Sequence, residues 1–212
     1  MILDHVHKVI CVHLPRREDR LTIAKGVFAA EGISDYVQFH AGVDGQLIVP
    51  PKGWPFSRGA YGCLLSHLSV LETARVNEWE SVLVFEDDVS LCSGFLGALD
   101  RCVRSIPGVW DALYMRSTCG LKEAKTTQHR SCFKTTGSFG RLGCIFKKSM
   151  YDALIESSRN AQQGKPWQRG DVAYAAVHRN FNVYVARPFL VGQVPTHSET
   201  EGRMSLQRHA RV

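Results

Sequence analysis

Three consecutive acidic residues at the end of an apolar run constrain this chain more than any other feature. Residues 81–91 read Ser-Val-Leu-Val-Phe-Glu-Asp-Asp-Val-Ser-Leu. A short run of Val, Leu and Phe bounded by polar residues predicts a strand buried on both faces. Carboxylates at its exit repel one another unless a cation or hydrogen-bond donors compensate them. Ligands of open α/β sheets bind outside the carboxyl ends of strands, so we expect Glu86, Asp87 and Asp88 to form the metal-binding edge of an active site.

Length and composition are those of one globular domain. The chain has 212 residues, of which 44% are hydrophobic and 22% charged, enough for a substantial core. No run approaches the ~20 apolar residues that span a bilayer. The N-terminus also lacks the basic-then-apolar order of a signal peptide, so we expect a soluble, cytoplasmic protein.

Cysteine usage and charge narrow the range of partners. The seven cysteines include no Cys-x-x-Cys pair, which indicates reduced thiols rather than a disulfide framework or a zinc knuckle. The net charge of +6 favours phosphate-bearing ligands or peripheral association with an anionic membrane. Because the basic residues are not interleaved with aromatic residues, no nucleic-acid partner is expected.

Apolar periodicity predicts strands and helices in alternation. We expect strands over residues 8–14, 36–41, 82–85, 110–115, 139–146 and 182–186. We expect helices over residues 21–31, 60–77, 95–106, 149–158 and 172–178, with Ser149 as a possible N-cap. The Pro- and Gly-rich passage between the second strand and the second helix is expected to rim a ligand site.

Several polar residues next to these segments have two possible roles. Arg16, Arg17 and Arg20 follow the first strand and either hold a nucleotide or its phosphates or form a solvated basic turn. Cys63 and His67 stand four apart, but a packed thiol and a hydrogen-bonded histidine are favoured over a metal site. Asp171 follows a glycine and either caps a helix or points into a pocket.

Three blocks of the sequence resemble successive signatures of glycosyltransferase family 25. They are residues 9–20, residues 62–67 and residues 82–89. Shorter similar blocks at residues 41–45, 110–114 and 193–198 extend the resemblance over nearly the whole chain. The family includes lipopolysaccharide galactosyltransferases and collagen galactosyltransferases.

The resemblance implies an α/β fold: a single Rossmann-like GT-A domain with a central mixed β-sheet flanked by helices. This domain would span residues 1–200, followed by a basic C-terminal tail over residues 201–212. It also implies an inverting hexosyltransferase that takes galactose or glucose from a UDP-sugar donor. Mn²⁺ or Mg²⁺ would be the cofactor, and a hydroxyl of a glycan or glycosylated surface component would be the acceptor.

The resemblance also assigns roles to individual residues. Glu86 and Asp88 align with the two acidic positions of the usual Asp-x-Asp motif, so Asp88 would bind the metal and Glu86 either the metal or the ribose. His197 is the best candidate for a further metal ligand, although the sequence is equally compatible with His197 being a surface histidine in a loop. Asp171 would be the base, and Asp87 would face the sugar. The residues expected to contact the nucleotide are His13, Leu14, Arg16, Arg17, Arg20, Ser66, His67 and Glu86.

Two other functions are compatible with the same residues. Family members commonly carry Asn where this chain has His13, which leaves open a non-catalytic carbohydrate-binding or assembly module with a transferase-like fold. A cation-dependent phosphatase or nuclease is less favoured, because the sequence shows no second acidic cluster for the second metal that such enzymes often use.

Overall fold

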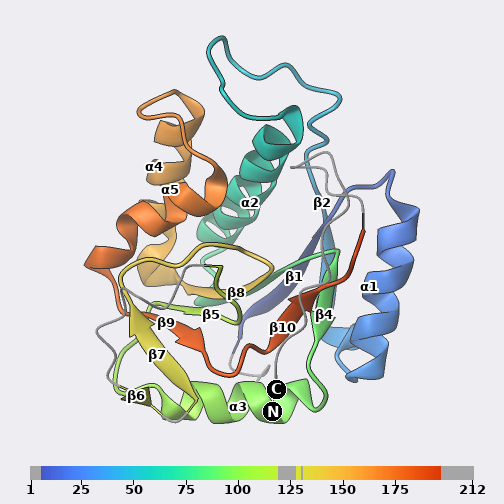
Figure 1. The fold of residues 1–212 in the computed structure, drawn as a ribbon, viewed down its shortest axis with the longest axis vertical. Coiled ribbons are helices and arrows are strands. Elements are labelled where there is room, and N and C mark those ends of the chain that lie inside the picture. Colours follow the sequence, from blue (N-terminus) through green and yellow to red (C-terminus); the bar gives the residue numbers. More distant parts are fainter. Residues whose placement is uncertain (1–5, 119–127, 130, 197–212) are drawn as a thin grey trace.

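A mixed sheet of eight strands forms the centre of the molecule (Figure 1). The computed structural model describes residues 6–118, 128–129 and 131–196. The strand order is β2-β1-β3-β8-β5-β9-β7-β6. These strands are β1 (Lys8–His13), β2 (Val37–Ala41), β3 (Ser81–Glu86), β5 (Ala112–Tyr114), β6 (Gln128–His129), β7 (Cys132–Thr135), β8 (Gly143–Lys147) and β9 (Val183–Ala186). A second, two-stranded sheet pairs β4 (Val89–Leu91) with β10 (Val191–Gln193).

Helices cover both faces of the central sheet (Figure 1). The α-helices are α1 (Glu18–Ala30), α2 (Arg58–Val76), α3 (Phe95–Ser105), α4 (Lys148–Gln162) and α5 (Gly170–Val177). Residues of α1 and α3 pack into the core on one face, and residues of α2, α4 and α5 pack on the other. The expected α/β class, with a central mixed sheet flanked by helices, is confirmed.

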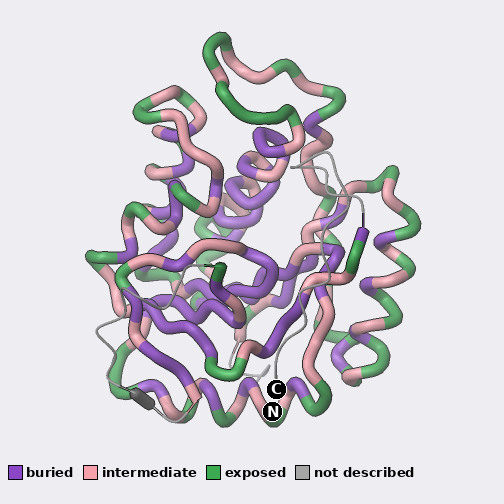
Figure 2. The backbone as a smooth tube through the Cα atoms, in the orientation of Figure 1, coloured by how far each residue is buried: buried purple, intermediate pink, exposed green. Residues whose placement is uncertain are grey.

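Strand β3 is buried on both faces, as its apolar run predicts. Leu83 and Phe85 face the core beneath α1 and α3. Val82 and Val84 face the core beneath α2 and α4. Figure 2 shows the same pattern along the backbone, where the central strands are largely buried. The acidic end of β3 is therefore anchored by apolar packing on two sides.

The connections around β1 create a switch point in the sheet. The chain runs from β1 through α1 to β2, and then through α2 to β3 on the other side of β1. All three strands are parallel, so their carboxyl ends meet at one edge. Because α1 and α2 lie on opposite faces, a crevice opens between the ends of β1 and β3, where ligands of α/β sheets usually bind.

The acidic run is divided between two sheets rather than forming one strand. Strand β3 ends at Glu86, Asp87 and Asp88 form a turn, and β4 joins the second sheet. The backbone N–H of Val194 donates to the carbonyl of Asp88 at 2.7 Å, which connects the turn to the segment after β10. The strand expected over the apolar run is confirmed, with the acidic residues at its carboxyl end.

Other segments also depart from the predicted boundaries. Ser149 is not an N-cap, because α4 begins at Lys148 and the Ser149 hydroxyl instead donates to Asp111. The strand expected over residues 139–146 begins only at Gly143, and β7 was not predicted. The predicted basic tail, residues 201–212, lies outside the described residues. None of the described helices is long and apolar enough to cross a membrane.

Candidate active site

Close contact between α2 and the loop after β2 shapes one wall of the site. A Cβ on Gly62 would lie 2.5 Å from the carbonyl oxygen of Val43, and one on Gly45 would lie 2.1 Å from that of Arg58. The Ser66 hydroxyl donates to the Gly62 carbonyl at 2.7 Å and accepts from the Val43 N–H at 2.8 Å. The predicted site residue Ser66 thus holds the loop against the helix.

A cleft lies beside this wall, at the carboxyl ends of β1 and β3. It encloses about 780 Å³ of empty space, open mouth included. The acidic triplet lines it, together with Leu14, Arg20, Asp44, Ser66, His67 and Gln193.

Asp87 lies at this cleft, but both of its carboxylate oxygens are already bonded. Oδ1 accepts from Arg20 Nη1 at 2.8 Å, and Oδ2 lies 3.0 Å from His13 Nδ1. All three side chains are buried. His13 contacts the acidic turn rather than forming part of the cleft lining. This geometry favours a role for Asp87 in bracing the turn.

Asp88 is bonded on one side only. Oδ2 accepts from Gln193 Nε2 at 2.9 Å and lies 3.3 Å from Arg20 Nη2. Oδ1 is buried, and no described residue provides it with a hydrogen bond. Burial, with the charge of Glu86 as a further cause, raises the pKa of Asp88 to about 6. A buried carboxylate oxygen without a partner is costly, and a cation would compensate it.

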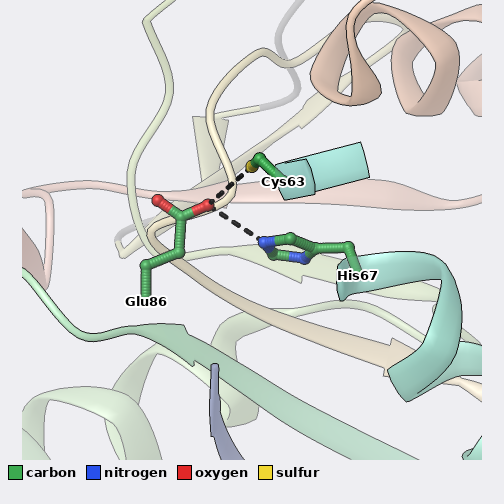
Figure 3. A group of neighbouring side chains, drawn as sticks. All are labelled: Cys63, His67 and Glu86. Atoms are coloured by element: carbon green, nitrogen blue, oxygen red, sulfur yellow. Dashed lines mark hydrogen bonds and ion pairs between the residues drawn. The ribbon is translucent and has the colours of Figure 1, made fainter. Parts of the chain in front are cut away.

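Glu86 receives two protein contacts through one oxygen (Figure 3). His67 Nε2 lies 3.0 Å from Oε1, and Cys63 Sγ lies 3.9 Å from the same atom. Burial lowers the pKa of His67 to about 4, so the neutral ring donates to Glu86. Burial opposes ionisation of Glu86, but the His67 hydrogen bond and the nearby positive charges of Arg141 and Arg20 together lower the pKa of Glu86 to about 2. Figure 3 shows the other oxygen pointing away from both neighbours.

Cys63, His67 and Glu86 have ligand atoms within 4.8 Å of one another, the spacing of a possible metal site. However, burial raises the pKa of Cys63 to about 12, and a thiol is not the metal-binding form. Arg141 Nη2 also donates to Cys63 Sγ at 3.1 Å, which places a positive charge beside it. The hydrogen-bonded interpretation fits better, and a hard cation fits the oxygens of Asp88 and Glu86 instead.

A second cleft adjoins the first, and Cys63 and Glu86 line both. Asp171 lines the second cleft. Asp171 is not the N-cap of α5, because the helix begins at Gly170 and Arg169 occupies the cap position. Its Oδ1 accepts from the Val172 N–H at 3.0 Å within the first turn. The carboxylate therefore lies at the second cleft, separated from the first by Glu86.

The three predicted nucleotide-binding arginines have different environments. Arg20 is buried and lines the first cleft, whereas Arg16 and Arg17 are not among its lining residues. Arg16 pairs with Asp44, and Arg17 pairs with Asp19 two positions away. Of the remaining expected residues, His197 lies outside the described residues.

Sequence reasoning missed two residues of these clefts. Gln193 comes from β10 and reaches Asp88. Arg141 comes from the loop before β8 and reaches Cys63 from 78 positions away. Both stand in segments that the sequence singled out, the block at 193–198 and the glycine-containing run at 139–146. No local pattern indicated which of their side chains face the site.

Comparison with known families identifies the class of this chain. The model of glycosyltransferase family 25 (LPS biosynthesis protein) matches residues 11–160. This match covers more than half of the chain, and the chain therefore belongs to glycosyltransferase family 25. The family resemblance expected from the sequence blocks is confirmed.

Curated relatives match only parts of the chain. Inactive glycosyltransferase 25 family member 3 from Homo sapiens is 38% identical over 69 residues, which cover 31% of this chain and 12% of that protein. The Mus musculus protein of the same name is 29% identical over 133 residues, which cover 54% of this chain and 22% of that protein. The matches thus span less than a quarter of either relative.

The solved structures that match this chain have little sequence identity with it. A glycosyltransferase involved in glycosylation of the major capsid of PBCV-1 has a TM-score of 0.44 and 8% identity, covering 84% of this chain and 92% of its own. The galactosyltransferase LgtC in complex with donor and acceptor sugar analogs has a TM-score of 0.45 and 12% identity, covering 84% of this chain and 72% of its own.

Proposed function

We propose that this protein is a metal-dependent, inverting glycosyltransferase. It transfers a hexose, galactose or glucose, from a UDP-sugar to a hydroxyl of a glycan or glycosylated surface component. The observation that carries the proposal is the buried, unpartnered Oδ1 of Asp88 beside Glu86, at the carboxyl end of β3 in the larger cleft. Family membership supports the transferase class, whereas the donor, metal and acceptor are our inference.

Asp88 and Glu86 would hold the divalent cation, with His197 as a proposed further ligand. When bound, Mn²⁺ or Mg²⁺ neutralises the charge that accumulates on the nucleotide diphosphate as the sugar departs. The carboxylate oxygens of Asp88 and Glu86 are ligands of the kind that such hard cations prefer. His67 orients Glu86 by its hydrogen bond, which leaves the second carboxylate oxygen directed away from the helix (Figure 3).

The donor would occupy the first cleft, where Arg20 provides positive charge next to the acidic turn. Leu14 and Asp44 line the same cleft and would contact the nucleoside. We assign to Asp87 the positioning of Arg20, because its oxygens are bonded to Arg20 and His13. Arg16 and Arg17 keep a supporting role at the rim at most, since each pairs with a nearby aspartate.

The acceptor would enter through the second cleft, where Asp171 would take the proton of its hydroxyl. A positioned base contributes about 10²- to 10⁴-fold to such a reaction. Because Glu86 lines both clefts, donor and acceptor would meet at this side chain. Asp171→Asn should therefore abolish sugar transfer while leaving UDP binding unchanged.

The proposal predicts that UDP with Mn²⁺ raises the melting temperature by several degrees. A ligand at 100 times its Kd adds about 2.7 kcal/mol to the free energy of unfolding. Asp88→Asn should abolish the shift and remain folded, whereas Asp152→Asn, an exposed aspartate on α4, should keep it. Thermal unfolding followed by fluorescence measures both. No shift with millimolar UDP and Mn²⁺ would contradict the proposal.

A non-catalytic binding module is the second candidate, because the human relative is named inactive. Such a module would bind UDP with metal but release no UDP from UDP-sugars. Measuring UDP release from UDP-galactose and UDP-glucose, with Glu86→Ala as the reference, separates the two functions. Release by the native chain that the variant lacks would identify an enzyme.

A further inference from the structure

Arg141 is a buried guanidinium with almost no polar partners. Its relative exposure is 6%, and its Nη1 has no hydrogen bond among the described residues. Its hydrogen bond runs from Nη2 to Cys63 Sγ, a weak acceptor. No carboxylate oxygen of a described residue lies within 4.0 Å of it. A buried cation without an anionic partner is unfavourable, so its retention here needs a reason.

The surrounding structure is built to hold this side chain in place. The guanidinium lies 5.0 Å from the centroid of the Tyr174 ring, over its face. A Cβ on Gly170 would lie 2.5 Å from Nη2 and 2.6 Å from Nη1, so only glycine leaves space for it there. The cation–π contact with Tyr174 and the space left by Gly170 hold the guanidinium in this position.

The charges around the second cleft leave Arg141 available. The cleft is also lined by Arg169, which has no ion-pair partner among the described residues. Burial lowers the pKa of Arg141, and the negative charges of the two acids of the cleft, Glu86 and Asp171, are among the causes that raise it. Neither acid contacts the guanidinium: Glu86 Oε1 accepts from His67, and Asp171 Oδ1 accepts from the Val172 N–H. Two arginines therefore face a cleft in which neither is neutralised by direct contact.

We propose that the second cleft binds an anionic substituent of the acceptor sugar, a carboxylate or a phosphate, through Arg141 and Arg169. This inference rests on the proposed function, because it identifies the class of acceptor at the same site. A planar guanidinium suits either anion and binds it through two parallel N–H groups. The cleft has about 470 Å³ of empty space, open mouth included, and opens to solvent.

The test measures sugar binding to the full chain without any donor. The probes are methyl glucuronide and glucose 6-phosphate, with methyl glucoside as the neutral match, followed by calorimetry or ligand-observed NMR. We expect at least one anionic sugar to bind tenfold or more tightly than the glucoside. The two anionic probes distinguish a carboxylate site from a phosphate site. Equal binding of all three sugars would overturn the inference.

Variants assign the preference to the two arginines. Arg141→Gln should abolish the preference for the anionic sugar. Because this side chain is buried and its replacement can affect folding, Arg169→Gln provides a second test at a half-exposed position. It should reduce the preference severalfold. Arg179→Gln, an exposed arginine beyond the end of α5, should leave it unchanged. A preference that survives in folded Arg141→Gln and in Arg169→Gln would refute the assignment.

The UDP and Mn²⁺ shift separates this inference from the proposed function. If UDP with Mn²⁺ raises the melting temperature and the three sugars bind equally, only the inference of an anionic acceptor is wrong. If the shift is absent and the anionic preference is present, the donor proposal fails while the anion site stands.

Discussion

Glu86, Asp87 and Asp88 are neighbours in sequence but have three different environments. Glu86 ends β3 and points toward α2, where His67 holds one oxygen. Asp87 is bonded through both oxygens. Asp88 keeps one buried oxygen without a described partner. The turn after β3 separates these directions, so three adjacent carboxylates have three different sets of contacts.

Removing the Asp87 carboxylate should strongly destabilise the fold. Asp87→Ala removes the shorter of the two ion pairs of the buried Arg20 and the carboxylate that contacts the buried ring of His13. Breaking a buried ion pair costs about 3–5 kcal/mol. Urea unfolding measures the loss. Asp19→Ala removes the surface partner of Arg17 and should have no measurable effect. Equal effects of the two substitutions would refute the bracing role.

Helix α2 positions the largest share of the site. Its second turn presses against the loop after β2, and its next turn carries Ser66 and His67 into the cleft. The close approach depends on Gly62, since a side chain there would meet the backbone of the loop. The helix and the loop therefore form one wall that must move together.

A methyl group at this contact should separate helix and loop. Gly62→Ala is expected to destabilise the protein by about 1–3 kcal/mol, as overpacking usually does. It should also weaken UDP binding. Gly26→Ala, in the exposed interior of α1 with nothing within 4 Å of the new Cβ, should instead stabilise by about 0.5–1 kcal/mol. Denaturant unfolding and UDP titration test this. A stabilised Gly62→Ala variant would contradict the contact.

The molecule as a whole is held by a sheet with helices on both faces and by polar contacts across it. His178 is one such contact, because Nδ1 accepts from the Ser138 N–H at 3.1 Å and Nε2 lies 3.0 Å from the Tyr114 hydroxyl. Its ring must be neutral to accept that hydrogen bond. Burial lowers the pKa of His178 to about 4.

Global stability should therefore fall as the solution becomes acidic. Between pH 6.5 and 4, His178 is protonated in the unfolded chain but not in the folded chain. Proton binding therefore stabilises the unfolded state relative to the folded state. The full effect is about 3 kcal/mol once the pH is below both values. His178→Gln should remove this part of the pH dependence, measured by urea unfolding at pH 7 and pH 4. If the free energy of unfolding changes equally between pH 7 and pH 4 in the variant and the native chain, the role of His178 is refuted.

Much of the architecture could be predicted from periodicity. The β1, α1, β2, α2 and β3 order followed from apolar spacing, because burial on one or two faces imposes a period on the sequence. The short strand β7 and the start of β8 were missed or misplaced. A strand of four residues such as β7 carries too little pattern to be distinguished from a loop.

The candidate site was only partly predictable. Parallel strands bring their carboxyl ends to one edge, so the acidic triplet, Leu14 and Arg20 could be expected there. Arg141 could not, because its place depends on Tyr174 and Gly170, which are remote in sequence.

The sequence by itself determined that a buried strand ends in three carboxylates and that the chain resembles family 25. Local spacing is sufficient for the first, and the order of short blocks along the chain is sufficient for the second. Only the tertiary structure decided that Asp87 is bonded through both oxygens, that Asp88 is not, and that an arginine without an anionic partner lies behind Glu86. Those outcomes depend on which distant side chains share a buried space, and packing alone sets that.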